Sequence, residues 1–245
     1  MIQKISEKTQ FNIDHKREEQ FSDFLDNHFY APLSSILTTP ETPVLFTRTT
    51  DISQQLSGID VVLHEGYHQT TIDEKCRLRT NGKDTSTFAF ELSFIKDGVV
   101  DVGWFLDPRK RTQAYLLCWP RLSNADEPWL QTEFLLVSRS RLIDTLHRHG
   151  FPREALAEYD EAIRAGNMHG RYRTHCSDVW FFHSMQYAEQ PINMILTTSF
   201  LSKVAMAHLI LDYDKATETS SFYGTWLGKP IQERVVGKPE QISLF

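Results

Sequence analysis

Residues 57–94 read SGIDVVLHEGYHQTTIDEKCRLRTNGKDTSTFAFELSF, and their pattern indicates how the chain is organised. Residues 61–63 favour a β-strand because β-branched and aliphatic side chains pack well on a pleated sheet. A second strand is predicted over residues 71–79, where polar and apolar side chains alternate. Residues 64–68 between them are typical of a turn, in which Gly66 supplies a backbone conformation that other residues avoid. The stretch therefore predicts two strands joined by a tight turn.

Two acids and a lysine lie on these two strands. Residues two apart on a strand share a face, so Asp73 and Lys75 point the same way and Glu74 points the other way. If the strands pair, Asp60 comes beside the face of Asp73 and Lys75. Carboxylate oxygens suit a hard cation such as Mg²⁺, and a nearby ammonium can offset charge developing on a phosphate. This arrangement predicts a divalent-metal site; the alternative is an exposed hairpin with ordinary surface charges.

Asp60 followed by Asp73-Glu74-Lys75 resembles the PD-(D/E)XK nuclease superfamily, which has the restriction-endonuclease-like fold. The signature of that family is an acid on one strand of a hairpin and an acid-x-Lys on the next. The resemblance covers about residues 45–95, and Gly58-Ile59 stands where the family has a proline before its first acid. It implies a metal-dependent DNA nuclease in which Lys75 positions the attacking water. The catalytic residues it implies are Asp60, Asp73, Lys75 and Glu91, with Mg²⁺ or Mn²⁺ held by Asp60, Asp73, Glu91 and the backbone carbonyl of Glu74.

A third strand, predicted over residues 85–95, places Glu91 in the middle of its polar face. The opposite face carries Phe88, Phe90 and Leu92, which is the alternation of a half-buried strand. Asp97-Gly98 after this strand predicts a hairpin turn. In the family that the chain resembles, a helix before the sheet carries a glutamate, and a helical Lys or a Gln sometimes assists. The possible counterparts here are Glu18, Glu19, Gln113 and Lys203; for the two glutamates the alternative is a solvated helix surface.

Composition limits the class of protein. The chain has 245 residues, of which 40% are hydrophobic, so it can bury the core of one large globular domain. The first ten residues lack an apolar signal region, no stretch is long enough to span a membrane, and the three cysteines are scattered. We therefore expect a cytoplasmic protein without a disulfide framework.

The net charge of −6 is unusual for a protein that binds DNA, because phosphate contacts come mainly from surplus Lys and Arg. Local basic clusters could still supply such contacts, although a cluster of this kind is more often a solvated face. The pairs Arg139–Arg141 and Arg171–Arg173 are two examples. The basic residues nearest the predicted site, and hence the candidates for DNA contact, are Arg77, Arg79, Arg109, Lys110 and Arg111.

The rest of the chain predicts an α/β or α+β domain with a mixed central sheet flanked by helices, and the resemblance implies a restriction-endonuclease-like core. A helix is expected over residues 14–29, ended by Pro32. Ser138 or Ser140 is expected to cap a helix, and Gly166 to end the next one. Further strands are expected over residues 44–49, 99–106, 112–119, 134–137, 178–185 and 192–198, and further helices over residues 138–149, 153–166 and 200–211.

The chain loses its periodicity near residue 217, and residues 228–240 are expected to be a loose tether. This divides the chain into a domain, residues 1–227, and a flexible tail, residues 228–245. The last five residues resemble the bacterial sliding-clamp binding motif, in which two apolar side chains enter a pocket and a glutamine binds at its rim. The residues that carry this resemblance are Gln241, Ile242, Ser243, Leu244 and Phe245.

Together the two resemblances predict a metal-dependent deoxyribonuclease that the tail recruits to the DNA sliding clamp. Such recruitment suits repair, replication-linked processing or defence against foreign DNA, because tethering raises the effective concentration of an enzyme at its substrate. A second hypothesis is a non-catalytic clamp-binding adaptor or inhibitor on a nuclease-like scaffold. In a third, Leu244 and Phe245 pack on the core of the protein itself.

Overall fold

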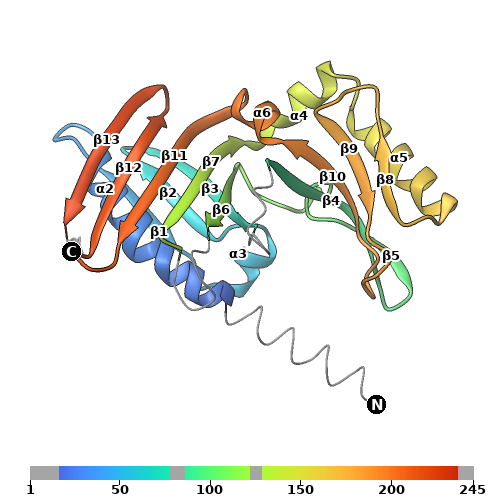
Figure 1. Ribbon diagram of the computed structural model, residues 1–245, viewed down its shortest axis with the longest axis horizontal. Helices are drawn as coiled ribbons and strands as arrows, with labels where there is room; N and C mark the ends of the chain where they lie inside the picture. Colours follow the sequence, from blue (N-terminus) through green and yellow to red (C-terminus); the bar gives the residue numbers. More distant parts are fainter. Residues whose placement is uncertain (1–16, 78–85, 122–128, 237–245) are drawn as a thin grey trace, which may run out of the picture.

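The computed structural model describes residues 17–77, 86–121 and 129–236, which form two β-sheets lying next to each other (Figure 1). The expected mixed α+β class is confirmed in the form of a large, curled, mixed sheet with few helices. Within the described ranges, no helix combines the length and the apolar character needed to cross a bilayer.

Sheet A has eight strands in the order β1-β2-β3-β6-β7-β11-β12-β13. Strands β3 and β6 are parallel neighbours, with Asp73 opposite Tyr115, and the other neighbours in this sheet are antiparallel. The strands are β1 (Val44–Arg48), β2 (Val61–Glu65), β3 (His68–Cys76), β6 (Ala114–Arg121), β7 (Gln131–Ser138), β11 (Ala205–Asp214), β12 (Thr219–Trp226) and β13 (Lys229–Val236).

Sheet B has five strands in the order β5-β4-β10-β9-β8, and all neighbours are antiparallel. Phe88, Phe90 and Leu92 on its strand β4 are buried, as their alternation predicts. Glu91 is opposite Asn193 on β10, so it belongs to sheet B and not to the sheet that carries Asp73. The strands are β4 (Thr87–Lys96), β5 (Val99–Val102), β8 (Gly170–Arg173), β9 (Val179–His183) and β10 (Ile192–Thr197).

The N-terminal helical segment is longer than expected. Residues 17–25 are α-helical and continue through the π-helical turn η1 (Asp26–Tyr30) into α2 (Ala31–Leu37). Pro32 does not end the helix, which corrects the prediction. It lies in the first turn of α2, directly after the π-helical turn η1, where the regular α-helical hydrogen-bond pattern is already interrupted.

The other helices are short or lie beside sheet B (Figure 1). The predicted cap at Ser138 is confirmed, because its side chain accepts a hydrogen bond from the backbone N–H of Arg141. Gly166 is the last residue of its helix, and Asn167 adopts the left-handed conformation that was expected of the glycine. The helices are α3 (Ile52–Leu56), α4 (Arg139–Arg148), α5 (Arg153–Gly166) and α6 (Thr198–Ser202).

Each face of sheet A packs into a separate hydrophobic core. The N-terminal helical segment covers one face, and the opposite face packs against sheet B, α4 and α5. Aromatic rings join the two sheets: the ring of Phe90 lies 6.0 Å from that of Tyr115, and the ring of Phe88 lies 5.3 Å from that of Trp119. The central strands of sheet A are therefore covered on both faces.

The two predicted turns are present. Gly66 and Tyr67 join β2 to β3, so that Glu65 pairs with His68. Asp97 and Gly98 both have positive φ angles, 52° and 78°, which is the backbone twist that a two-residue hairpin needs. The strand after this second turn ends at Val102, four residues earlier than expected.

Two predictions about the C-terminal part of the chain are wrong. The helix expected over residues 200–211 is replaced by the short helix α6 and then by strand β11. Ala207, Leu209 and Leu211 are buried while His208 and Ile210 are more exposed, which is the two-residue period of a strand. Most of the expected tether is also a strand, because Lys229–Val236 form the edge strand β13, paired with β12; residues 237–240 lie outside the described residues.

The pairing of β11 with β12 can be tested at Gly224, which lies opposite Leu209 with a φ angle of 136°. A Cβ atom there would lie 2.0 Å from the carbonyl oxygen of His208. We expect Gly224→Ala to lower the free energy of unfolding by about 2 kcal/mol or more, measured by chemical denaturation. Gly228→Ala is the matched control, because Gly228 also has a positive φ angle but an added Cβ would have no neighbour within 4 Å. Equal effects of the two substitutions would contradict this account.

Candidate functional site

The β2–β3 hairpin fixes the position of Asp60. Its backbone N–H donates to the carbonyl of Ile72, and its carbonyl accepts from the N–H of Thr49, each at 2.9 Å. The carboxylate Oδ2 accepts a hydrogen bond of 2.8 Å from the backbone N–H of Glu74. Asp60 therefore lies just before β2 with its side chain held against β3, as the hairpin pattern predicts.

Asp73 and Lys75 form a close ion pair on one face of β3. The Lys75 Nζ lies 2.5 Å from Asp73 Oδ1, and the side chain of Asp73 is only 3% exposed while that of Lys75 is 27% exposed. The Lys75 ammonium also lies 5.1 Å from the centre of the Trp104 ring, within the range of a cation–π interaction. The structure thus brings the predicted acid-x-Lys pair together, with its ammonium reaching toward solvent.

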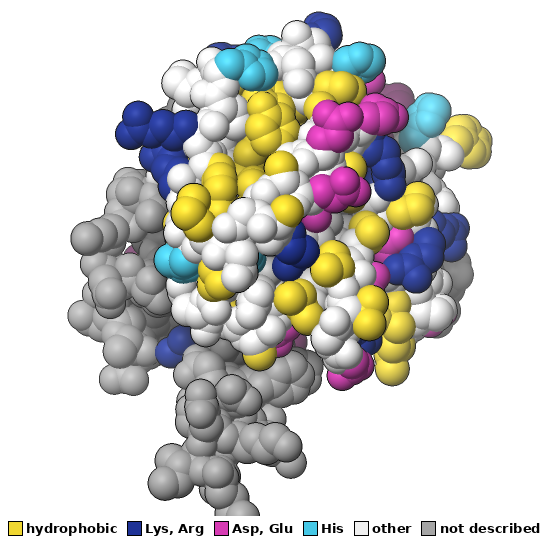
Figure 2. Space-filling model, turned by 90° about the vertical axis from the view of Figure 1, so that its right-hand side faces the viewer, with side chains coloured by type: hydrophobic (Ala, Val, Ile, Leu, Met, Phe, Trp, Pro, Cys, Tyr) yellow, Lys and Arg dark blue, Asp and Glu magenta, His cyan; other side chains and the backbone are white. Residues whose placement is uncertain are grey.

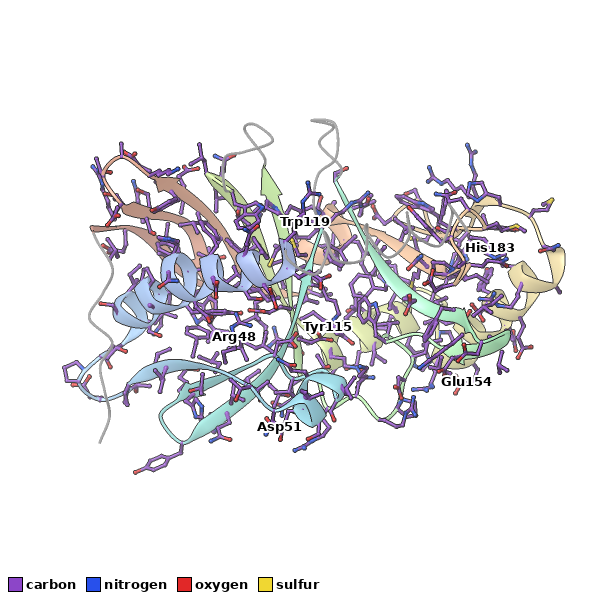
Figure 3. All side chains as sticks on the ribbon, turned by 90° about the horizontal axis from the view of Figure 1, so that it is seen from below. Arg48, Asp51, Tyr115, Trp119, Glu154 and His183 are labelled. Atoms are coloured by element: carbon purple, nitrogen blue, oxygen red, sulfur yellow. The ribbon has the colours of Figure 1, made fainter. Side chains whose placement is uncertain are left out.

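Glu74 points to the opposite face, as expected for a residue between Asp73 and Lys75 on a strand. Its carboxylate accepts two hydrogen bonds from the Arg48 guanidinium, at 2.8 and 3.0 Å, and one of 2.7 Å from the Tyr30 hydroxyl. Arg48 in turn donates to the carboxylate of Asp26 in the helical segment, and Figure 3 shows Arg48 next to that segment. This network joins the helix to the sheet, so the side chain of Glu74 has a structural partner and is not part of the acid cluster.

The carboxylates of Asp60 and Asp73 are close enough to influence each other. Burial and the nearby charge of Asp73 raise the pKa of Asp60 to about 7, although the Lys75 ammonium and the hydrogen bond from Glu74 act in the opposite direction. A carboxylate that is hard to ionise next to a second carboxylate is a place where an added cation would be favoured. One buried and one half-buried carboxyl group and one ammonium therefore form the chemical core of the site.

Glu91 lies near this core but is not gathered into it. Burial raises its pKa, whereas a hydrogen bond from the backbone N–H of Trp104 and the charge of Lys75 lower it. Among the described residues, no group of three or more His, Cys, Asp or Glu side chains is arranged to hold a metal ion. Asp60 and Asp73 lie close together, and Glu91 interacts with Lys75 from the other sheet, so the predicted metal set stays a prediction.

Close packing at Gly58 shapes one edge of the site. Gly58 has a φ angle of 74°, and the position of a Cβ atom there lies 2.3 Å from Thr112 Oγ1 and 3.3 Å from Asp73 Oδ2. The Thr112 hydroxyl donates to the Gly58 carbonyl at 2.8 Å, and the Lys110 ammonium donates to the Leu56 carbonyl at 2.8 Å. A glycine is needed here both for its backbone conformation and for the space that a side chain would take from Asp73.

Tyr115 and Arg139 lie behind the acids. Tyr115 is opposite Asp73 in the β3–β6 pairing and lies in the middle of the molecule (Figure 3). Burial raises the pKa of its hydroxyl, with Arg139 lowering it and Asp73 raising it. The buried Tyr115 hydroxyl and Arg139 Nε lack a well-formed hydrogen bond within the described part of the chain. The alternation within β6 predicts that Tyr115 is buried, but only the parallel pairing places it next to Asp73.

The predicted DNA-contact residues have different surroundings. Arg77 donates to the backbone and side-chain oxygens of Thr87, each at 2.7 Å, and so joins the two sheets. Arg109 pairs with Asp107 but is 77% exposed. Lys110 and Arg111 lie in the loop beside Gly58, where the Arg111 N–H donates to the Ser57 carbonyl. Arg79 lies outside the described residues.

The other possible counterparts of family residues divide into two groups. Glu18 and Glu19 are exposed on the helical segment, which covers the face of Glu74 and not that of Asp73. Lys203 is exposed after α6. Gln113 lies next to the hairpin, because its side-chain oxygen accepts a hydrogen bond of 2.8 Å from the Thr71 N–H. The clamp-binding pentapeptide, residues 241–245, lies outside the described residues.

Comparisons with protein-family models, with curated proteins and with solved structures find no match to this chain. The function of the protein is therefore inferred from the geometry of the site and from the two sequence resemblances.

The raised pKa of Asp60 predicts how stability changes with pH. Because this pKa is about 7 in the folded chain, and about 4 in an unfolded chain, the folded state holds the proton more tightly. The resulting stabilisation is complete below about pH 4 and is lost as the pH rises through 7. We expect Asp60→Asn, which cannot titrate, to become progressively more stable relative to the unmodified protein over this range in metal-free buffer. Denaturation at several pH values measures the difference, and a constant difference would exclude a perturbed Asp60.

Proposed function

We propose that the protein is a metal-dependent deoxyribonuclease that hydrolyses DNA phosphodiester bonds at Asp60, Asp73 and Lys75. The observation that carries the proposal is the convergence of these three groups: Lys75 Nζ lies 2.5 Å from the carboxylate of Asp73, and the charge of Asp73 acts on Asp60. The same hairpin carries the acid and acid-x-Lys signature of the PD-(D/E)XK superfamily. Lys75 pairs with Asp73, and Asp60 adds a second carboxyl group beside that pair, held by the backbone N–H of Glu74.

The residues present fit a hard divalent cation such as Mg²⁺ or Mn²⁺. Mg²⁺ keeps several of its waters and is commonly held by one or two carboxylates together with substrate phosphates, which matches the pair Asp60 and Asp73. In the proposal these two side chains and the backbone carbonyl of Glu74 hold the ion, and Glu91 remains a possible further ligand. When bound, the ion would polarise the phosphate and make a bound water more acidic.

Lys75 has the properties needed next to such a reaction. Its ammonium is anchored by Asp73 and by the face of Trp104, and 27% of the side chain is exposed, so it can meet an incoming phosphate. A fixed positive charge beside the scissile phosphate offsets the negative charge that develops as water attacks. Lys75 would also orient that water by donating a hydrogen bond to it.

Recruitment to a sliding clamp is the second part of the proposal. The peptide that resembles the clamp-binding motif, residues 241–245, follows the edge strand β13 after a short connecting sequence. The net charge is −6, and the face at the α5 end carries acidic, basic and apolar side chains interspersed (Figure 2). Tethering compensates for weak intrinsic affinity by raising the local concentration of the enzyme on DNA. The alternative that the tail supports equally is a non-catalytic adaptor or inhibitor that binds the clamp.

Removing the ammonium tests the catalytic assignment. We expect Lys75→Ala to lower the rate of DNA cleavage in the presence of Mg²⁺ or Mn²⁺ by at least about a hundredfold. Because this change leaves Asp73 buried without its partner, the melting temperature is measured in parallel. Asp60→Asn serves as a second variant, since its amide oxygen can still accept the hydrogen bond from Glu74, and it should also abolish cleavage.

Lys215→Ala is the matched control, because Lys215 is exposed in the β11–β12 turn. Wild-type cleavage by folded Lys75→Ala and Asp60→Asn proteins would disprove the assignment. A panel of single-stranded, double-stranded and branched DNA identifies the substrate form.

Deleting residues 241–245 separates the hypotheses about the tail. For a recruited nuclease we expect clamp binding to be lost while cleavage of naked DNA continues at an unchanged rate, measured by clamp pull-down and by gel assay. An adaptor would lose clamp binding and show no cleavage before or after the deletion. A tail that packs on its own protein would instead lower the melting temperature on deletion, with no clamp binding by the full chain. Lys238→Ala, outside the pentapeptide, is the control.

A further inference from the structure

A groove with both polar and apolar side chains in its lining opens at the rim of sheet A, next to the acid cluster. It has a volume of about 430 Å³ and lies between the start of β6 and the start of α4. The residues that line it come from four parts of the chain that only the tertiary structure brings together. They are Thr70, Thr112, Gln113, Ser138, Arg139, Ser140, Ile143 and Met206.

The lining of this groove is suited to an anion. Of the described residues that line it, none is acidic, one is an arginine and four carry hydroxyl groups. The side-chain oxygen of Gln113 is already used by the N–H and the hydroxyl of Thr71, which leaves its amide nitrogen as the group able to act on a ligand. The groove therefore offers one positive charge, the Gln113 amide nitrogen and hydroxyl groups, of which that of Thr112 already donates to the Gly58 carbonyl.

Arg139 is weakly held by the protein itself. Its two terminal nitrogens donate to the backbone carbonyls of Lys110 and Asp107, each at a long 3.4 Å. Its Nε atom is buried without a well-formed hydrogen bond among the described residues, and the nearby Tyr115 hydroxyl interacts with the Arg139 side chain. A buried guanidinium nitrogen without an acceptor is costly, and an anion in the groove would supply acceptors.

The groove adjoins the proposed catalytic residues through Thr112. The Thr112 hydroxyl and the Asp73 carboxylate both pack against Gly58. They lie 2.3 and 3.3 Å from the position that a Cβ atom would take on this glycine. Thr112 therefore belongs both to the wall of the groove and to the packing around Gly58 and Asp73, which makes the groove and the acid cluster neighbours in the fold.

We propose that this groove is a phosphate-binding subsite that holds the backbone of a DNA strand beside the Asp60–Asp73–Lys75 cluster, with Arg139 as its charged ligand and Gln113 and Ser140 as donors. The identity of the ligand as DNA rests on the proposed function, whereas the anion site rests on the groove alone. Its role is to position the strand, and Arg139 is a positioning residue and not a catalytic one.

Binding of labelled single- and double-stranded oligonucleotides in metal-free buffer tests the subsite without cleavage. We expect Arg139→Ala to weaken binding about tenfold and to lower the slope of log K against log salt concentration by about one, as the loss of one phosphate contact requires. Arg139→Lys keeps the charge but loses the planar fork, so its affinity should lie between those of the other two proteins. Arg141→Ala is the matched control, because Arg141 is exposed on the same helix and does not line the groove. Melting temperatures confirm that each variant is folded.

Three results distinguish failure of the subsite from failure of the nuclease proposal. If folded Arg139→Ala binds DNA with the affinity and salt dependence of Arg141→Ala, the subsite is overturned while the nuclease proposal stands. If Arg139→Ala weakens binding but Lys75→Ala and Asp60→Asn cleave normally, the subsite is supported and the catalytic assignment falls. If the unmodified protein binds no DNA, the DNA subsite is overturned; thermal stabilisation by inorganic phosphate that depends on Arg139 would then support an anion site for a different ligand.

Discussion

Three consecutive charged residues on a central strand are the constraint to which the rest of the structure responds. β3 lies inside sheet A, between β2 and β6. A hydrophobic core packs on each face of this sheet, so both faces of Asp73-Glu74-Lys75 are covered. An unpaired buried charge costs several kcal/mol, on the order of 3–5 when one partner of a buried pair is removed, so each charge needs a partner. On one face Glu74 receives Arg48 and Tyr30, and on the other Asp73 receives Lys75.

The two faces use this constraint differently. The Glu74 network is fully paired and connects the N-terminal helical segment to the sheet, which makes it a structural element. On the Asp73 face the second carboxylate, Asp60, adds a negative charge that one lysine does not balance, and burial together with the nearby charge of Asp73 raises its pKa to about 7. In the proposed function this face, and not the paired Glu74 face, is the place for a cation and a phosphate.

The second sheet gives the site its surroundings. Trp104, which follows β5, lies against Lys75, and its ring is 5.3 Å from that of Tyr115. The loop before β6 crosses Gly58 and brings Thr112 beside Asp73. The acid cluster is thus bounded by an aromatic wall on one side and by the donor-lined groove at Arg139 on the other. In the proposed function and subsite, Lys75 at the acid pair and Arg139 in the groove are the two cations that contact the phosphodiester backbone.

The sequence by itself determined the local features: the hairpin at Gly66, the opposite directions of Asp73 and Glu74, and the turn at Asp97-Gly98. These follow from strand periodicity and turn chemistry, which act over a few residues. Only the tertiary structure decided that Tyr115 and Arg139 lie behind Asp73, that Glu91 belongs to a second sheet, and that residues 205–214 form a strand. The physical reason is that pairing between strands distant along the chain depends on burial shared by both, and the pattern within one segment does not specify its partner.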